Sequence, residues 1–118
     1  MPQDFKRLRL WQEAKEFVVA VYKATEKFPM NEQYAMTQQI RRASYSIPAN
    51  IAEGSGKRTQ KEFARYLSIA NGSIKEVENF LILSNELGYL EKQSFEELLE
   101  KLEKIAMMNH KLLEKVRN

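Results

Sequence analysis

The sequence predicts an all-α protein, an antiparallel up-down-up-down four-helix bundle, and three observations point to it. Apolar residues recur every three or four positions along four segments of the chain. Only 4 Gly and 3 Pro occur in 118 residues, too few turn formers for a sandwich or barrel, which needs a turn roughly every 8–12 residues. The chain is 43% apolar and 30% charged, which is enough apolar material for one core in a single domain over residues 1–118.

The first two predicted helices cover residues 10–27 and residues 31–53. The first ends before Pro29, because a residue that precedes proline is pushed out of the helical region. Pro48 lies inside the second helix and removes one of its main-chain hydrogen bonds, so we expect a kink there. We also expect the side chain of Asn50 to bond near the carbonyl of Ser44, which Pro48 leaves unpaired.

Glycines and a threonine mark where the second helix ends and where the third begins and ends. Gly54 and Gly56 follow the second helix, and the pair permits the left-handed conformation of a C-cap. Thr59 and Glu62 have the spacing of a capping box, so the third helix is predicted to begin at Thr59. Gly88 is the expected C-cap of that helix.

The fourth predicted helix begins near Ser94, where Ser94 and Glu97 form a second capping-box pattern. Its apolar positions continue to Val116. The connections between the four predicted helices are only about three to seven residues long, and such short connections force consecutive helices to lie antiparallel.

The third predicted helix has two adjacent apolar stripes where a monomeric bundle needs one. The first stripe consists of Phe63, Leu67, Ala70, Ile74, Val77, Leu81 and Ser84. The second consists of Tyr66, Ser73, Phe80, Leu83 and Leu87. Taken alone, the residues leave two interpretations open: a broad face toward the core, or a surface buried against another subunit.

The net charge of +3 is unevenly distributed along the chain. Residues 38–65 contain six basic and two acidic side chains, a net charge of +4. Residues 1–37 have a net charge of +1, and residues 66–118 have a net charge of −2. A positive excess in the middle of the chain is suggestive of an anionic partner.

The chain lacks residues that several classes of function require. The chain has no Cys and a single His, which excludes disulfides, zinc–thiolate sites and iron–sulfur clusters. We therefore expect no metal and no cofactor, and a protein that is not an enzyme; an active site built across subunits from Glu53 and Glu76 is the remaining catalytic alternative. No apolar run approaches about 18 residues and residues 1–10 hold no signal-peptide core, so we expect a cytoplasmic protein without a membrane partner.

Residues 39–58, QIRRASYSIPANIAEGSGKR, resemble a four-helix-bundle family first noticed as proteins encoded by intervening sequences within bacterial 23S rRNA genes. The family motif is matched at Gln39, Arg41, Arg42, Ala43, Ser46, Ile47, Asn50, Ile51, Ala52, Glu53, Gly54, Gly56 and Lys57. Further matches extend the resemblance over nearly the whole chain, and Ala35 departs from it where relatives place Gly.

The resemblance implies a four-helix bundle that assembles as a homopentamer around a central channel, with the second apolar stripe as the subunit contact. A related protein, the accessory variability determinant of diversity-generating retroelements, has a basic surface and works with a reverse transcriptase and RNA. The resemblance thus implies a homo-oligomer whose partner is RNA or a reverse transcriptase-type protein.

The motif places a polar stripe on the second predicted helix, formed by Gln39, Arg42, Ser46, Asn50 and Glu53. One interpretation is a functional site that lines an oligomer channel or grips a phosphate. The other, which we favour, is a structural polar network between the second and third helices, because buried charges must be paired and hydrogen-bonded. In that network Arg42 meets Glu76, Glu78 or Glu53.

Basic residues cluster where the third helix begins, at Lys57, Arg58, Lys61 and Arg65, and we expect Arg41 close by across the helical hairpin. A helix N-terminus with several cations favours phosphate binding, although an ordinary solvated face would look the same. We therefore predict a non-enzymatic oligomer that binds RNA or a nucleic-acid-processing partner through these five residues. The alternative is a protein–protein interaction module that binds no nucleic acid.

Overall fold

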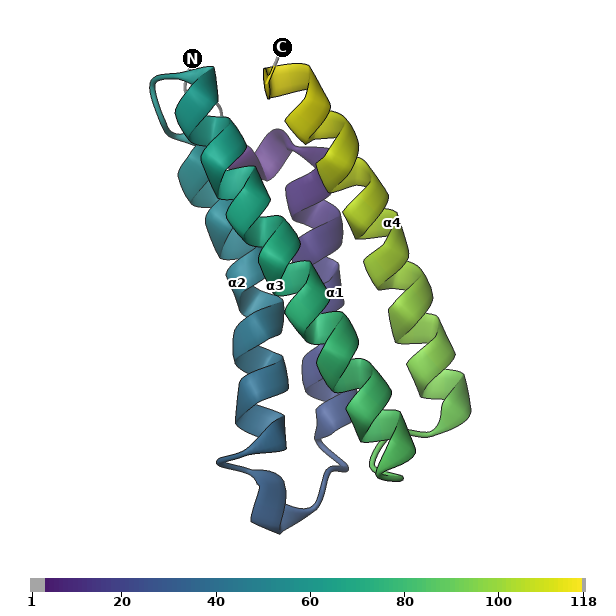
Figure 1. The fold of residues 1–118 in the computed structure, drawn as a ribbon. Coiled ribbons are helices and arrows are strands. Elements are labelled where there is room, and N and C mark those ends of the chain that lie inside the picture. Colours follow the sequence, from purple (N-terminus) through teal and green to yellow (C-terminus); the bar gives the residue numbers. More distant parts are fainter. Residues whose placement is uncertain (1–3, 118) are drawn as a thin grey trace.

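Four α-helices run alternately up and down in the structure, a computed structural model that describes residues 4–117 (Figure 1). The elements are η1 (Phe5–Arg7), α1 (Arg9–Thr25), η2 (Met30–Glu32), α2 (Met36–Ser55), α3 (Gln60–Glu86) and α4 (Lys92–Arg117). No strand occurs within residues 4–117, and the bundle measures 44 × 23 × 20 Å. The predicted four-helix bundle is therefore confirmed.

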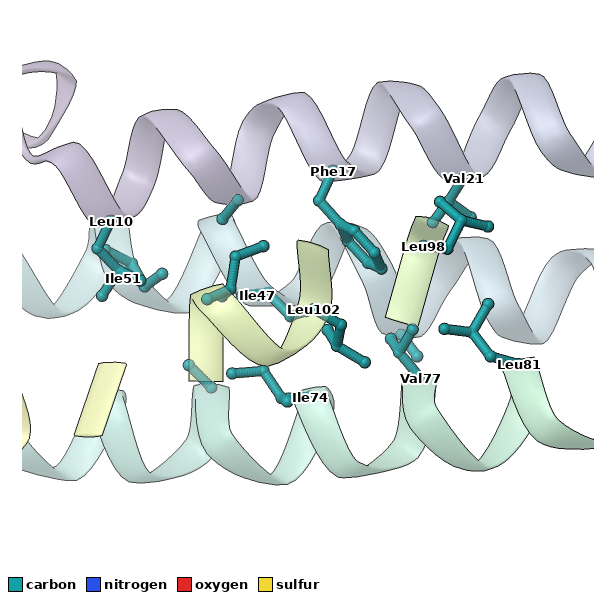
Figure 2. Close-up of a cluster of buried hydrophobic side chains, with 14 of the residues drawn as sticks. Leu10, Phe17, Val21, Ile47, Ile51, Ile74, Val77, Leu81, Leu98 and Leu102 are labelled. Carbon is teal, nitrogen blue, oxygen red and sulfur yellow. The ribbon is translucent and has the colours of Figure 1, made fainter. Parts of the chain in front are cut away.

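One apolar stripe from each helix faces the centre and forms a single core (Figure 2). Its largest side chains are almost completely buried: Phe17, Ile40, Ile47, Ile51, Leu67, Ile74, Leu81, Leu102 and Ile105. Removing one such side chain from water contributes about 1.5–3 kcal/mol, so this stripe accounts for most of the driving force for packing. The first of the two stripes predicted on α3 lies in this core.

The helix α2 begins later than the sequence pattern predicts. The chain forms the 3-10 turn η2 at residues 30–32, and Ala35 then has φ −126° and ψ −102°, outside the helical region. The main-chain amide of Met36 donates a hydrogen bond to Glu32 Oε1 at 3.1 Å, so this carboxylate satisfies an amide at the start of α2. Glu32 lies four residues before Met36, so this contact does not have the spacing of a capping box.

Pro48 lies within α2, which continues through it from Met36 to Ser55. The side chain of Asn50 donates from Nδ2 to the carbonyl of Ser46 at 2.8 Å. The prediction that Asn50 bonds near the carbonyl of Ser44 is therefore wrong, because the amide reaches the carbonyl four residues before it on the same helix.

The left-handed C-cap predicted at the end of α2 is also wrong. Gly56 has φ −88° and ψ −2°, and Gly88 alone among the described glycines has a positive φ. Gly54 lies inside the helix, and a Cβ atom there would stand 2.6 Å from the Cβ of Tyr66 on α3. The absence of a side chain at Gly54 thus lets α2 and α3 approach each other closely.

The predicted N-cap of α3 is confirmed. Its C-cap is Leu87, with Gly88 one residue later, and the predicted start of α4 differs as well. Thr59 Oγ1 accepts a hydrogen bond from the amide of Glu62 at 3.1 Å, and Gly88 has a φ of +81° just after α3. The helix α4 begins at Lys92, so Ser94 lies in its first turn and cannot be the N-cap. The amide of the following residue, Phe95, donates to the carbonyl of Glu91 at 2.9 Å, which shows that the helix has already formed.

Candidate nucleic-acid interface

Four of the five predicted binding residues lie together at the connection between α2 and α3. Lys57 and Arg58 belong to the connection, and Lys61 and Arg65 lie in the first two turns of α3. Arg58, Lys61 and Arg65 are exposed, and the side chain of Lys57 is 34% exposed. All four side chains are therefore at least partly exposed to solvent at this end of the bundle.

Tyr66 organises part of this cluster. Its hydroxyl donates to Glu53 Oε2 at 3.2 Å, and its ring lies 5.2 Å from the Nζ of Lys57. The guanidinium of Arg65 lies 5.8 Å from the same ring. The half-buried Tyr66 thus holds two cations through cation–π contacts, which each contribute roughly 0.5–1 kcal/mol at such exposed sites.

The antiparallel topology adds more basic residues to the same end of the bundle. The start of α1 and the end of α4 lie beside the α2–α3 connection (Figure 1). We call this region the basic end and define it as residues 4–13, 53–65 and 110–117. Its basic side chains are Lys6, Arg7, Arg9, Lys57, Arg58, Lys61, Arg65, Lys111, Lys115 and Arg117, against the acidic Asp4, Glu13, Glu53, Glu62 and Glu114.

The other half of the bundle has the opposite charge along α4. Residues 86–103 contain Lys92 and Lys101 against Glu86, Glu91, Glu96, Glu97, Glu100 and Glu103. The charge of the protein is therefore polarised along the bundle axis, and the potential near the basic end favours anions. The basic residues at the two chain ends do not stand out in the sequence, because they are 48 or more positions from Lys57 and join it only through the fold.

Arg41 does not join the basic end. Its Nε donates to Thr25 Oγ1 at 2.8 Å, and its guanidinium stacks 4.4 Å from the centre of the Tyr22 ring, near the end of α1. Sixteen residues separate it from Lys57, about 24 Å of chain at 1.5 Å per helical residue. The expectation that Arg41 lies close to the other four is wrong, because the start of α2 pairs with the second half of α3.

The predicted polar stripe joins α2 to α3 at several levels. Arg42 forms an ion pair with Glu76 and donates from Nη2 to Gln39 Oε1 at 3.1 Å. One turn further along, Ser46 Oγ donates to Ser73 Oγ at 2.6 Å. These contacts connect the two helices in the manner of a structural network.

The ion pair in this stripe differs from the buried network that the sequence suggested. The side chains of Arg42 and Glu76 are 44% and 37% exposed. Water screens such a pair, and its contribution to stability is about 0–1 kcal/mol. Asn50 bonds within its own helix, and Glu53 bonds to Tyr66, so these two members of the stripe contribute to different contacts.

One carboxylate links α1 to α4 beside the basic end. Glu13 Oε2 accepts a hydrogen bond from Arg9 Nε at 3.2 Å and lies 3.5 Å from the Nζ of Lys104. The hydrogen bond from Arg9, helped by the positive charge of Lys104, lowers the pKa of Glu13 below its ordinary value against the opposing effect of burial. Both cations stabilise the ionised carboxylate.

The described part of the chain contains no group of three or more His, Asp or Glu side chains placed to hold a metal ion. Within residues 4–117, no helix has the length and apolar character needed to span a membrane.

Comparisons with known proteins agree with the sequence resemblance. Residues 6–111 match the family model described as 23S rRNA-intervening sequence protein. The solved structure of a protein of unknown function from the S23 ribosomal protein family of Bacteroides thetaiotaomicron is 27% identical, with a TM-score of 0.78. That match covers 88% of this chain and 97% of the other. No curated protein is significantly similar to the chain. On the strength of the family match over residues 6–111, the chain belongs to the family of 23S rRNA-intervening sequence proteins.

Proposed function

We propose that this protein is a cytoplasmic, non-enzymatic oligomer that binds structured RNA through its basic end. The observation that carries the proposal is the convergence of cations from residues 4–13, 53–65 and 110–117 on one end of the bundle. Cations that neutralise phosphates release counterions from the nucleic acid, and this release supplies most of the affinity of sequence-independent binding. An RNA helix presents its phosphates in the closely spaced array that such a surface can neutralise.

The ion pairs at this end leave part of its charge available to phosphates. Arg9 pairs with Glu13 at 3.2 Å, and Arg117 pairs with Glu114 at 3.8 Å. Lys57 lies 4.0 Å from Glu53, at the limit of an ion pair. The exposed Lys61, Arg65, Lys111 and Lys115 extend the surface on either side of these pairs. We assign the main phosphate contacts to the residues around the start of α3.

The oligomer is proposed to form through the outer face of α3. Ile69, Leu83 and Leu87 are 41%, 41% and 56% exposed, and Phe80 beside them is half-buried. The spacing of these four residues, 11, 3 and 4, keeps them on one face of the helix. Phe80, Leu83 and Leu87 belong to the predicted second apolar stripe, and their position supports a subunit contact for this part of it. Tyr66 and Ser73 of the same stripe contact α2 within the chain. The stoichiometry that we propose, a homopentamer, comes from the family resemblance.

A charge-reversal experiment tests RNA binding by the basic end. The variant K57E/R58E/K61E/R65E should bind a fluorescently labelled RNA hairpin at least about tenfold more weakly than the wild type in 0.1 M salt. The control K23E/K27E/K92E/K101E makes the same change in net charge at the opposite end and should bind nearly as well as the wild type. If both variants are folded by circular dichroism and lose the same amount of RNA affinity, the loss follows from net charge alone. That result would reject the basic end as the binding surface.

The alternative function is a protein–protein interaction module, with a reverse transcriptase-type protein or another polypeptide as its partner. The exposed apolar residues on the outer face of α3 favour this alternative, because they could pack against another protein as well as against a second copy. A protein of that kind would show no salt-dependent affinity for any RNA. The RNA titration therefore decides between the two functions.

A further inference from the structure

A cleft of about 420 Å³ lies at the end of the bundle opposite the basic end. It is formed by the second half of α1, the segment after η2 and the first turns of α2. Tyr22, Tyr34 and Tyr45 line it together with Arg41, and Gln38 adds an amide. The volume falls within the range of small-molecule sites, about 300–1,000 Å³.

Arg41 is held rigidly at the wall of this cleft. Its Nε donates to Thr25 Oγ1 at 2.8 Å, its Nη2 donates to the carbonyl of Tyr22 at 3.3 Å, and its guanidinium stacks 4.4 Å from the centre of the Tyr22 ring. Thr25 is itself buried and donates its hydroxyl proton to the carbonyl of Val21 at 2.8 Å. The oxygen of Thr25 is thereby oriented as an acceptor for Arg41.

The charge of Arg41 is not neutralised by the protein. Within residues 4–117, no carboxylate lies within the 4.0 Å that defines an ion pair with its guanidinium. Two hydrogen bonds engage the Nε side, which leaves the Nη1 side of the planar group with donors for an anion. A half-buried guanidinium that is already ordered loses little side-chain entropy when it binds a phosphate or a carboxylate in two-point fashion.

Two exposed aromatic rings line the cleft beside the polar side chains of Gln33, Thr37, Gln38, Gln39 and Arg42. Tyr34 is 82% exposed and Tyr45 is 49% exposed, so each offers part of its ring to a ligand. Stacking of a nucleic-acid base on an aromatic side chain contributes about 1–3 kcal/mol. The amide of Gln38 can donate and accept hydrogen bonds at the edge of a base.

The cleft combines one arginine without an ion pair with exposed tyrosine rings, and this combination indicates the class of ligand. The neighbouring Arg42 is already paired with Glu76, so among the residues 4–117 that line the cleft, Arg41 is the basic side chain without an ion pair. An acidic peptide would need several cations, whereas a nucleotide combines one phosphate with one planar base. We propose that the cleft binds a nucleoside monophosphate unit, with its phosphate on the Nη1 side of Arg41 and its base against Tyr34, the more exposed of the two rings. The unit is either a free mononucleotide or an unpaired nucleotide of a strand.

A titration followed by NMR and calorimetry tests this proposal. Adenosine monophosphate should shift the side-chain resonances of Arg41 and Gln38, and adenosine or inorganic phosphate alone should bind at least about tenfold more weakly, because each lacks one of the two contacts. A short oligoadenylate that binds more tightly than the monophosphate would identify a strand as the source. Equal affinity per nucleotide would identify the free mononucleotide.

Two variants report on the two halves of the site. R41Q removes the charge and should weaken binding of adenosine monophosphate at least about tenfold, the effect of losing roughly 1.4 kcal/mol. Y34S removes an exposed ring without touching the core and should weaken binding, whereas Y34F should retain it. The control R9Q, at the basic end, should bind the nucleotide like the wild type.

Three results would overturn the nucleotide site: no binding of adenosine monophosphate at millimolar concentration by the folded protein, unchanged binding in both R41Q and Y34S, or tighter binding of an acidic peptide than of the nucleotide. The cleft shares no residue with the basic end. The variant K57E/R58E/K61E/R65E should therefore bind the mononucleotide normally even where it fails to bind the RNA hairpin, so the two proposals succeed or fail separately.

Discussion

Gly54 on α2 lies directly against Tyr66 on α3, so closely that a Cβ atom at Gly54 would stand 2.6 Å from the Cβ of Tyr66 and 3.0 Å from Cδ1 of Phe63. The same tyrosine donates a hydrogen bond to Glu53 and stacks near Lys57. The two helices thus pack closely against each other at the base of the basic end, next to the residues that contact Lys57.

The first prediction concerns this contact. Alanine at Gly54 should lower the free energy of unfolding by about 1–3 kcal/mol, because the new methyl group meets the Cβ of Tyr66, which can move only with its backbone. Alanine at Gly72, inside α3 with no atom within 4 Å of its added Cβ, should raise it by about 0.5–1 kcal/mol through helix propensity. Urea denaturation of the two variants measures both values. Changes of the same sign would contradict the proposed role of Gly54.

The second prediction concerns Asn109, a polar residue that is only 1% exposed within the core. Its Nδ2 donates to the main-chain carbonyl of Leu67 at 3.0 Å, and its Oδ1 has no hydrogen-bond partner among the described residues. Because an unsatisfied buried oxygen costs about 1–3 kcal/mol, N109L should unfold at a higher urea concentration than the wild type. N109D should be less stable by about 3 kcal/mol or more, since it buries an unpaired charge. If N109L proves as unstable as N109D, the bond to Leu67 outweighs the cost of the unsatisfied oxygen.

The third prediction concerns Glu13, whose pKa is lowered in the folded state by Arg9 and Lys104. A lowered pKa means that its contribution to stability is present above the unfolded pKa, about 4.5, and is lost as the pH falls through the folded pKa. The contribution is under about 1 kcal/mol, because Arg9 is largely exposed and the pair is screened. The variant E13Q should therefore be slightly less stable than the wild type at pH 7 and equally stable near pH 3.

Urea unfolding at the two pH values measures this difference, and E16Q on the same helix is its control. Glu16 is exposed and forms no ion pair with the described residues. A difference between E13Q and the wild type that persists unchanged at pH 3 would show that the side chain of Glu13 acts through packing instead of charge.

The helices could be predicted because their apolar residues recur with the helical period, and that period alone places one stripe of each helix in a common core. The predicted starts of α2 and α4 are wrong, because contacts that the helical period does not reveal determine where these helices begin. Glu32 caps α2 from the preceding turn, and α4 begins before the capping-box pattern at Ser94. Gly54 carries the pattern of a C-cap, and only the position of Tyr66 shows that it serves close packing.

The sequence predicts the basic residues around the α2–α3 connection, but it does not predict that residues from both chain ends join them. Lys57, Arg58, Lys61 and Arg65 are neighbours in sequence, so they were visible as a cluster. The basic residues of both chain ends join them through the antiparallel topology, which the composition of any one segment does not reveal. The sequence predicts the wrong end of the bundle for Arg41, because the pairing of α2 with α3 shows only in contacts such as Ser46 with Ser73.

The most direct test of RNA binding by the basic end is the dependence of RNA affinity on salt. The logarithm of the association constant for an RNA hairpin should fall linearly with the logarithm of the KCl concentration in the wild type. Replacing Lys57, Arg58, Lys61 and Arg65 by Gln should make this slope shallower by about one for each lost phosphate contact, up to about four. A wild-type affinity independent of salt, or a slope that the four replacements leave unchanged, would contradict phosphate recognition by the basic end.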